Sequence, residues 1–499
     1  MEFKIKKINV RTGGILIALM HVRDADLYDI YSMDRVKIKK GKKNIVVTVD
    51  ITTSSKLVKP GEIGLFHESF SILGAKGNEK VEVEITKKPS SIHFIKKKLS
   101  GGRLNEKEMY SIIKDITEGV LSDIEITYFV SGCYIHELSL KETVALTKAM
   151  INNGEILKLK KKVVVDKHCI GGVAGNRTTP IVVSILAAAG ITIPKTSSRS
   201  ITSAAGTADT VEVFCKVSFS IKKMKQIVNK TNGCFVWGGG LNLAPSDDKI
   251  IKVEHPVSLD PVGQLIASIL AKKRSVSATH VLIDIPVGRD AKIEKMKNAL
   301  RLKKKFKEVG KAIGLKVKVY ITDGSQPIGN GIGPILEARE VINILKNKSK
   351  DRYHDMFRRK CLHIAGDLIE LTGKTKKGKG YMYAKNILES GKAYTKFKEI
   401  VKAQEGKVRD PDNMRLGRFR YHFYAPKDGK VTFISNRTIN RLAKIAGAPH
   451  DKEAGLYLHV HKNSKVKKGD KLFCLYSDSK QRLEFARKEY KSWGGIEIK

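Results

Sequence analysis

The most informative segment of the chain runs from Val163 to Phe214 and reads VVVDKHCIGGVAGNRTTPIVVSILAAAGITIPKTSSRSITSAAGTADTVEVF. Apolar runs in it alternate with two polar loops, and each loop follows a predicted strand and precedes a predicted helix. The alternation continues in HVLIDIPVG and in KVKVYITDG, each of which leads into a helical pattern. Strands that alternate with helices predict an α/β sheet with crossover helices, in which ligands bind beyond the carboxyl ends of the strands.

The first loop has the composition of an anion-binding cradle. Gly171, Gly172 and Gly175 let backbone N–H groups approach a ligand closely. Thr179 followed by Pro180 has the form of a helix N-cap and a first helical residue, and helix N-termini bind anions. An ordinary glycine-rich turn is the alternative, because the loop is neither a Walker loop nor a dinucleotide fingerprint.

The second loop offers hydroxyl groups and one guanidinium group as hydrogen-bond donors. They belong to Ser197, Ser198, Arg199, Thr202, Ser203 and Thr207. Thr207 is predicted to cap a further helix, so two predicted anion-binding helix starts follow one another. A serine-rich turn without a ligand is again the alternative.

The whole chain of 499 residues is long enough for three or four compact domains. Its changes of periodicity predict the fold class α/β, or α+β overall. We expect a β-rich N-terminal domain at 1–85, a helical domain at 86–158 joined by a segment near 250–278, a central α/β domain with a mixed sheet at 159–413, and a β-rich C-terminal domain at 414–499.

The predicted helical domain carries three capping boxes, in which a polar N-cap residue is followed three positions later by Glu. The pairs are Asn105 with Glu108, Ser122 with Glu125, and Ser139 with Glu142. They predict the starts of three short helices and indicate no function, because amphipathic helices of this kind usually form a core.

Composition sets limits on the class of protein. Lys and Arg number 94 against 51 Asp and Glu, which gives a net charge of +43 and makes nucleic acid a partner to consider. The lysines are spread from Lys4 to Lys499 in short clusters, so we expect a lysine-rich surface and no dedicated nucleic-acid function. The six cysteines form no CxxC pair, and the apolar run Ile181 to Ile191 is too short to span a bilayer. We therefore expect reduced thiols, no metal site, no membrane segment and a cytoplasmic location.

One motif in the first loop resembles a family signature. The run Lys167-His168-Cys169-Ile170-Gly171-Gly172-Val173 is similar to the Lys-His-Ser-x-Gly-Gly-Val hallmark of the thymidine and pyrimidine-nucleoside phosphorylase family. The segments GNRTTP, IPKTSSRSITS and AGTAD, with the extra β-rich N-terminal domain, resemble its AMP phosphorylase branch more closely. The resemblance covers essentially the whole chain. It implies a pentosyltransferase of nucleotide salvage that uses orthophosphate to cleave nucleoside monophosphates (AMP, also CMP and UMP) to ribose 1,5-bisphosphate and free base.

The resemblance also implies which residues bind the substrates. Orthophosphate ligands fall on Lys167, Thr179, Ser197 and Thr207. Nucleotide-binding positions fall on Gly172, Ser198, Arg199, Ser200, Ile201, Thr202, Ser203, Thr207, Ser268 and Lys292. Cys169 stands where Ser is usual, and a thiol is a weaker donor, so orthophosphate loses part of one hydrogen bond. A reactive or redox role for this cysteine is the alternative.

The catalytic acid of the branch falls on Asp260 in SLDPVG. Protonation of the departing base makes it a better leaving group, and a carboxyl group does this at neutral pH only if its pKa is raised. Without the resemblance, Asp260 before Pro261 is better explained as a helix N-cap. His168 is a second candidate for acid or base contact, with a packed histidine as the alternative.

Substrate choice rests on a departure from the family pattern. Pyrimidine-nucleoside members contact the base through an Arg upstream of the acid and through a Ser and a Lys further on. This chain keeps Ser268 and Lys272, but the upstream segment 253–256 reads VEHP and lacks Arg. Lys292 or Arg199 offers a cation for a 5′-phosphate, which favours nucleotides over nucleosides.

The expected partners follow from the resemblance. Orthophosphate is a co-substrate, no cofactor is required, and a homo-oligomer (a dimer or larger) is expected by analogy alone. Three alternatives stay open. They are a pyrimidine-nucleoside phosphorylase, a nucleic-acid-binding protein that explains the charge, and a phosphoribosyltransferase, whose usual pyrophosphate loop is not evident.

Overall fold

The computed structural model describes residues 1–86, 88–201, 203–257, 259–348 and 351–499. The chain forms two compact units. The first contains Met1–Asn153 and Pro245–Gln264, and the second contains Gly154–Ala244 and Leu265–Lys499.

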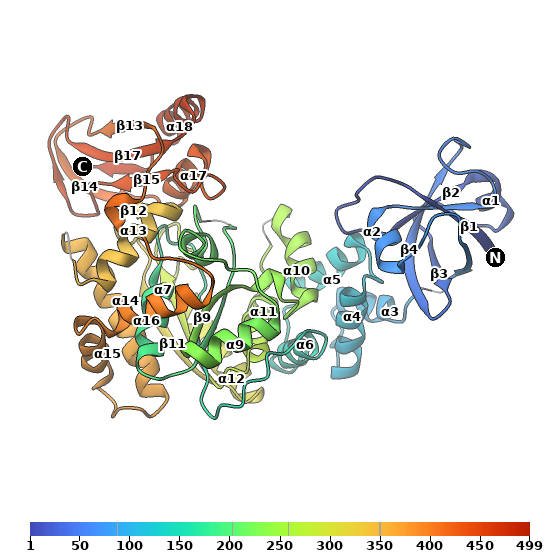
Figure 1. Cartoon of the computed structure of the whole chain (residues 1–499), viewed down its shortest axis with the longest axis horizontal. Helices are drawn as coiled ribbons and strands as arrows, with labels where there is room; N and C mark the ends of the chain where they lie inside the picture. Colours follow the sequence, from blue (N-terminus) through green and yellow to red (C-terminus); the bar gives the residue numbers. More distant parts are fainter. Residues whose placement is uncertain (87, 202, 258, 349–350) are drawn as a thin grey trace. The chain divides into compact units, whose positions relative to one another are not determined.

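The first unit begins with a closed β-barrel, drawn in blue in Figure 1. Its strands follow the order β1-β5-β2-β4-β3-β6, and alternate side chains such as Phe3, Ile5, Val36 and Ile38 form a buried core. The barrel elements are β1 (Glu2–Lys7), β2 (Ile17–His21), α1 (Val22–Leu27), β3 (Arg35–Lys40), β4 (Lys43–Thr52), β5 (Glu62–Leu65), α2 (His67–Leu73) and β6 (Lys80–Ile85).

Short helices complete the first unit. They are α3 (Ser91–Leu99), α4 (Glu106–Glu118), α5 (Asp123–Ile135), α6 (Leu140–Asn152), α10 (Pro245–Glu254), the 3₁₀ helix η2 (His255–Val257) and the first residues of α11 (Val262–Ser275). The three predicted capping boxes are confirmed at the starts of α4, α5 and α6, where each Glu side chain also accepts from the backbone of its N-cap residue. Local sequence rules therefore fix these helix starts.

Parallel strands form the centre of the second unit. The order β11-β10-β7 describes one sheet, and β8 pairs with β9 in another. Every described strand pair in these two sheets is parallel, so the expectation of a mixed sheet is wrong here. A parallel bridge between Val164 and Thr192 links the chain next to β7 with the chain next to β8. The strands are β7 (Val165–Cys169), β8 (Ile193–Ser197), β9 (Gly233–Trp237), β10 (His280–Val287) and β11 (Lys316–Asp323).

Helices surround these strands and supply most of the core. Helix α7 (Thr178–Ala188) is apolar on all sides, and it packs against α14 and α16 because it has no polar face to turn to water. The other helices are η1 (Gly238–Gly240), α8 (Thr207–Val211), α9 (Ile221–Thr231), α12 (Met296–Ala312), α13 (Pro334–Leu345), α14 (Arg352–Leu371), α15 (Gly380–Glu389) and α16 (Lys392–Ala403).

The end of the chain forms antiparallel sheets with two helices, drawn in orange and red in Figure 1. One sheet has the order β12-β15-β17-β13 and the other β16-β14-β18. The elements are β12 (Gly331–Ile332), η3 (Pro411–Asn413), β13 (Phe419–Tyr424), β14 (Gly429–Ile434), α17 (Asn436–Ala446), β15 (Gly455–Leu458), β16 (Lys465–Val466), β17 (Lys471–Ser477), α18 (Lys480–Trp493) and β18 (Ile496–Ile498). Among the described residues, no helix combines the length and the apolar character that a membrane span requires.

Candidate active site

The carboxyl end of β7 lies beside β10 and carries Lys167, His168 and Cys169. In the parallel register of β7 and β10, Lys167 lies opposite Leu282 and Cys169 lies opposite Asp284. Successive side chains of a strand point to opposite faces of the sheet. Lys167 and Cys169 therefore share one face, and His168 faces the other side. The carboxyl end of β7 thus has two separate polar environments, one on each face of the sheet.

The Lys167 face contains a second buried cation, Lys360 of α14. Its ammonium lies 3.1 Å from the carboxylate of Asp284, which also accepts a hydrogen bond of 2.6 Å from Thr322. Burial lowers the pKa of Lys167. In Lys360 the effect of the Asp284 carboxylate outweighs that of burial, so the pKa of Lys360 is raised. Sequence reasoning missed Lys360, because a lysine inside an ordinary helical pattern gives no local signal.

Cys169 is a protonated thiol in this environment. The side-chain amide of Asn176 donates to its sulfur at 3.0 Å. Burial and the nearby Asp284 carboxylate raise the pKa of Cys169 to about 12. Because the thiolate is the reactive form of cysteine, this environment favours a small side chain in place of serine over a reactive or redox role.

The His168 face contains a buried cluster of one carboxylate and two lysines. Asp166 lies 2.8 Å from the ammonium of Lys273 and 3.5 Å from that of Lys195. Burial lowers the pKa of Lys195 to about 7. Burial and the neighbouring lysines hold the pKa of His168 well below its usual value. The imidazole is therefore neutral at physiological pH. It can hydrogen-bond a ligand, but it cannot act as a general acid.

The first loop brings two predicted nucleotide-binding residues together. Gly172 has a φ of +87°, which only glycine adopts readily. A Cβ atom added there would collide with the backbone nitrogen of Lys292, so Gly172 lies directly against the segment that carries Lys292. Close backbone approach explains why this position holds glycine.

Arg177 anchors the end of the first loop. Its guanidinium donates to the carbonyl oxygens of Ile328 at 3.0 Å and Gly331 at 2.8 Å, and it forms a buried ion pair with Glu340. Arg177 is also the residue before α7, which begins at Thr178. The prediction of Thr179 as the N-cap is therefore wrong by two positions, because the chain is already helical at Thr178.

The first turn of α7 contacts the strand lysine directly. The ammonium of Lys167 donates to the hydroxyl of Thr178, which in turn donates to Asn176 at 3.2 Å. Thr179, the phosphate ligand that the resemblance implies, is buried beside it. Thr178 is a further candidate that sequence reasoning missed, since two adjacent threonines gave no reason to prefer the first.

Asp209, rather than Thr207, binds the backbone N–H groups at the end of the second loop. Helix α8 begins at Thr207 after Gly206, and the Asp209 carboxylate accepts from the backbone of Gly206 at 2.9 Å and of Ser200 at 2.7 Å. The prediction that Thr207 caps this helix is therefore wrong. A carboxylate at the third helical position accepts from the backbone N–H of the N-cap residue, as the Glu side chain of a capping box does.

The hydroxyl groups of the second loop differ in their partners. Ser200 and Ser203 donate to loop carbonyls, those of Ser203 and Ala205. Ser197, at the end of β8, has a hydroxyl oxygen that is shielded from solvent and has no hydrogen-bond partner among the described residues. Ser198 and Ile201 are exposed, and the predicted ligand Thr202 lies outside the described residues. A shielded hydroxyl without a partner is costly unless a ligand completes it.

Arg199 is engaged by carboxylates of its own loop and helix. Its guanidinium makes hydrogen bonds of 2.8 and 2.7 Å to Glu212 and one of 3.1 Å to Asp209, and it stacks on Trp237. The Glu212 hydrogen bonds raise the pKa of Arg199, and the same pair lowers the pKa of Glu212 to about 2. Arg199, one of the two cations predicted for a 5′-phosphate, thus has two carboxylate partners.

The remaining predicted residues belong to α11 and the segment before it. Ser268 and Lys272 are half-buried on the part of α11 that belongs to the second unit, rather than to the helical part as expected. Asp260 is half-buried in the first unit, two residues before α11 begins. Its role as the acid rests on the resemblance.

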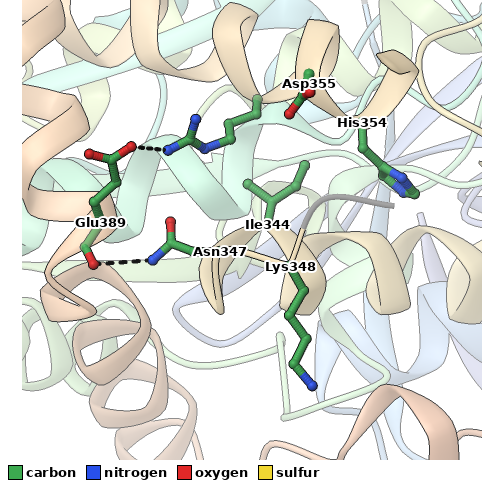
Figure 2. A pocket seen from close by; sticks show the side chains of 7 residues that line it. Ile344, Asn347, Lys348, His354, Asp355 and Glu389 are labelled. Atoms are coloured by element: carbon green, nitrogen blue, oxygen red, sulfur yellow. Dashed lines mark hydrogen bonds and ion pairs between the residues drawn. The ribbon is translucent and has the colours of Figure 1, made fainter. Parts of the chain in front are cut away.

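A cavity of about 210 Å³ lies elsewhere in the second unit. Figure 2 shows its lining, with Glu389 held by the Arg358 guanidinium at 2.6 Å and by the Asn347 amide. The lining residues are Ile344, Asn347, Lys348, His354, Asp355, Arg358 and Glu389. None of the described residues that the resemblance assigns to substrates lines this cavity, so we do not take it for the active site.

Comparison with protein families matches three parts of the chain. A glycosyl transferase family helical bundle domain covers 92–154, and the a/b domain of a glycosyl transferase family covers 161–394. A pyrimidine nucleoside phosphorylase C-terminal domain covers 430–497. These matches take in every described loop of the candidate site.

Curated relatives match the chain over nearly its full length. The AMP phosphorylases of Pyrococcus furiosus and Thermococcus kodakarensis are each 44% identical, over 97% of this chain and 95% of theirs. A putative thymidine phosphorylase of Legionella pneumophila is 43% identical, over 97% of this chain and 92% of its own. Overall identity therefore does not separate the two activities.

Solved structures share the fold. The anthranilate phosphoribosyltransferase of Thermus thermophilus superposes with a TM-score of 0.52 at 17% identity, over 62% of this chain and 99% of that chain. The enzyme of Saccharomyces cerevisiae, in complex with PRPP and Mg, gives a TM-score of 0.52 at 13% identity, over 63% of this chain and 98% of its own. At these identities the likeness concerns the fold.

Proposed function

The chain belongs to the thymidine and pyrimidine-nucleoside phosphorylase family and is a pentosyltransferase, and we propose that it cleaves AMP with orthophosphate to ribose 1,5-bisphosphate and adenine. The observation that carries the proposal is the pair of loops after β7 and β8. The first follows the buried cation Lys167, and the second follows Ser197, whose shielded hydroxyl has no partner among the described residues. A bound phosphate supplies the missing acceptor.

The proposed mechanism uses charge and position. Lys167 and Lys360 neutralise orthophosphate on their face of the sheet, while Thr179 and Ser197 supply hydroxyl donors. Lys292, which Gly172 holds against the first loop, takes the 5′-phosphate. Attack by phosphate oxygen on C1′ displaces the base with inversion. Holding two anions together against their repulsion and away from water supplies most of the rate enhancement.

The departing base needs a proton donor other than His168. The low pKa of this histidine leaves it neutral, so it acts as a hydrogen-bonding contact. We assign protonation of the base to Asp260, following the resemblance.

Preference for nucleotides rests on two features. Relatives at 44% identity are named AMP phosphorylases, and the segment 253–256 lacks the arginine that pyrimidine-nucleoside members use. We propose that CMP and UMP are also accepted. The second candidate function is a nucleoside phosphorylase, which the name of the Legionella relative favours.

We also propose that the enzyme is a cytoplasmic homo-oligomer that needs no cofactor beyond its co-substrate. The free cysteines support the cytoplasmic location. The exposed apolar side chains Ile124, Tyr128 and Ile135 of α5 support the homo-oligomer. We expect the positive surface to gather small phosphorylated substrates rather than nucleic acid.

Release of free base tests the proposal. The substrates are AMP, CMP, UMP, thymidine and uridine, each with and without orthophosphate. We expect phosphate-dependent release from the nucleotides, lost in Lys167→Met and retained in Lys161→Met, a control at an exposed lysine. Preference for thymidine would assign the chain to the nucleoside branch, and hydrolysis without phosphate would contradict phosphorolysis.

A further inference from the structure

Helix α17 presents three polar side chains at successive turns to the candidate site. Asn436, Asn440 and Lys444 are spaced four residues apart, so they form one stripe along the helix. The side chains of Asn436 and Asn440 are almost completely buried. Asparagine is an expensive residue to bury unless its amide is satisfied, so the partners of these two side chains are informative.

Each side chain of the stripe binds a different point of the two loops. The Asn436 side-chain oxygen accepts from the backbone N–H of Ala174 at 3.0 Å, in the first loop. The Asn440 side-chain oxygen accepts from the backbone N–H of Ala204 at 3.0 Å, in the second loop. Lys444 donates to the carbonyl of Ile201, also in the second loop.

Apolar contacts reinforce the same attachment. Ala174 and Ala204 are fully buried in the core formed by the C-terminal sheets and by α17 side chains such as Ile439 and Leu442. Each loop thus inserts one methyl group into this core and donates one amide to an asparagine beside it. The two loops are about thirty residues apart in sequence, and α17 gives them a shared attachment.

Asn436 also ties the first loop to a third strand end. Its amide group donates to the carbonyl of Gly324 at 3.0 Å, directly after β11. Ser435, the N-cap of α17, contacts Asp290 in the segment before Lys292. The start of α17 therefore contacts the first loop, the end of β11 and the segment before Lys292.

We infer that Asn436 and Asn440 are positioning residues, which set the two anion-binding loops at a fixed separation for orthophosphate and nucleotide. This inference rests on the proposed function for the identity of the ligands. Neither residue touches the reacting atoms. They act through the backbone amides of Ala174 and Ala204. Loss of the Asn436 side chain therefore misplaces the first loop, and loss of the Asn440 side chain misplaces the second.

The separate attachment predicts a split between the two variants. Two of the four residues implied for orthophosphate, Lys167 and Thr179, flank the first loop, and the other two, Ser197 and Thr207, flank the second loop, which also carries most of the residues implied for the nucleotide. We expect Asn436→Ala to weaken orthophosphate binding by about fivefold or more with a smaller effect on AMP, and Asn440→Ala to weaken the binding of both ligands by a similar factor.

Calorimetric titration of the full chain with orthophosphate alone and with AMP alone tests the split without turnover. Leu442→Ala is the matched control, because it removes a buried side chain of the same helix and leaves both asparagines, and their hydrogen bonds to Ala174 and Ala204, in place. Asn440→Ser is a second variant, whose shorter side chain loses the Ala204 hydrogen bond but keeps a polar hydroxyl group at the position.

The outcomes are distinguishable. The inference stands if the asparagine variants show the split while Leu442→Ala, at a comparable loss of thermal stability, stays within twofold for both ligands. It is overturned if Leu442→Ala shifts both affinities equally, or if Asn436→Ala and Asn440→Ser leave them unchanged. Wild type that binds both ligands but does not cleave AMP refutes the proposed function alone, and wild type that binds neither refutes both.

Discussion

Cys169 of β7 lies opposite Asp284 of β10 in the parallel register, beside the ion pair that Asp284 forms with Lys360 at 3.1 Å. This relationship places a weak donor, a carboxylate and a cation where one strand end meets the first loop. Burial of Cys169, together with the Asp284 carboxylate, keeps the thiol protonated, and Lys360 lies near Cys169 and Lys167 as a second cation. Two predictions follow directly from it.

Replacing Cys169 with serine should improve orthophosphate binding. A hydroxyl is a stronger donor than a thiol and is similar in size, so we expect Cys169→Ser to lower the KM for orthophosphate about twofold to fivefold. Initial rates at varied phosphate concentration measure the change. Rapid alkylation of Cys169 by iodoacetamide at pH 8 would contradict the protonated thiol, whose pKa of about 12 predicts slow reaction.

Removing the charge of Lys360 should weaken orthophosphate binding. We expect Lys360→Met to raise the KM for orthophosphate about tenfold or more, because a buried cation facing an anion is not replaced by solvent. Lys318→Met is the control, since Lys318 of β11 pairs with a different carboxylate of α14, that of Asp367, at 2.8 Å. Equal KM values for the two variants would show that Lys360 does not contact phosphate.

The buried pair of Arg177 and Glu340 should be strongly coupled. Glu340→Gln leaves the guanidinium without its countercharge, so we expect the free energy of unfolding to fall by about 3 kcal/mol. Arg177→Lys should cost a similar amount, and the double variant less than the sum of both. Urea unfolding followed by tryptophan fluorescence measures this in the second unit, which contains both Trp237 and Trp493. Additive losses would contradict direct pairing.

His168 should make the protein less stable in mild acid. Its pKa is held well below 6.5 in the folded chain, so below about pH 6.5 the unfolded chain binds a proton that the folded chain does not. The stability that depends on the neutral imidazole is complete above that pH and declines as the pH falls. Urea midpoints from pH 7.5 to 5 should fall less steeply for His168→Gln than for wild type. The exposed His450→Gln control should follow wild type, and parallel profiles for all three proteins would argue against a neutral His168.

Asp260→Asn should slow the chemical step. Asparagine has no proton to give to the departing base, so we expect kcat for AMP to fall by about 10²-fold to 10⁴-fold with orthophosphate affinity nearly unchanged. Steady-state rates and phosphate titration measure the two effects. A loss of less than threefold would remove Asp260 from the mechanism.

Local sequence rules predicted part of this structure well. The capping boxes of α4, α5 and α6 need only residues three positions apart, and all three are present. The alternation of strands and helices predicted the α/β centre, because each element is stabilised by its own periodicity. The starts of α7 and α8 were predicted less well. At Thr207, the carboxylate of Asp209 does the capping from inside the helix.

The remaining features depend on parts of the chain that are distant in sequence. Lys360 comes from α14, and Asn436 and Asn440 come from α17, so only folding brings them to the loops after β7 and β8. Their residue types are ordinary for exposed helix faces. A single sequence therefore gives no signal that separates them from surface residues.

The phosphorus NMR spectrum of the product formed from AMP and orthophosphate tests the central claim most directly. Phosphorolysis predicts a ribose with two phosphate groups, one from AMP at C5 and one from the medium at C1, with one orthophosphate consumed for each adenine released. Ribose 5-phosphate formed without consumption of orthophosphate would instead identify a hydrolase and would contradict the account.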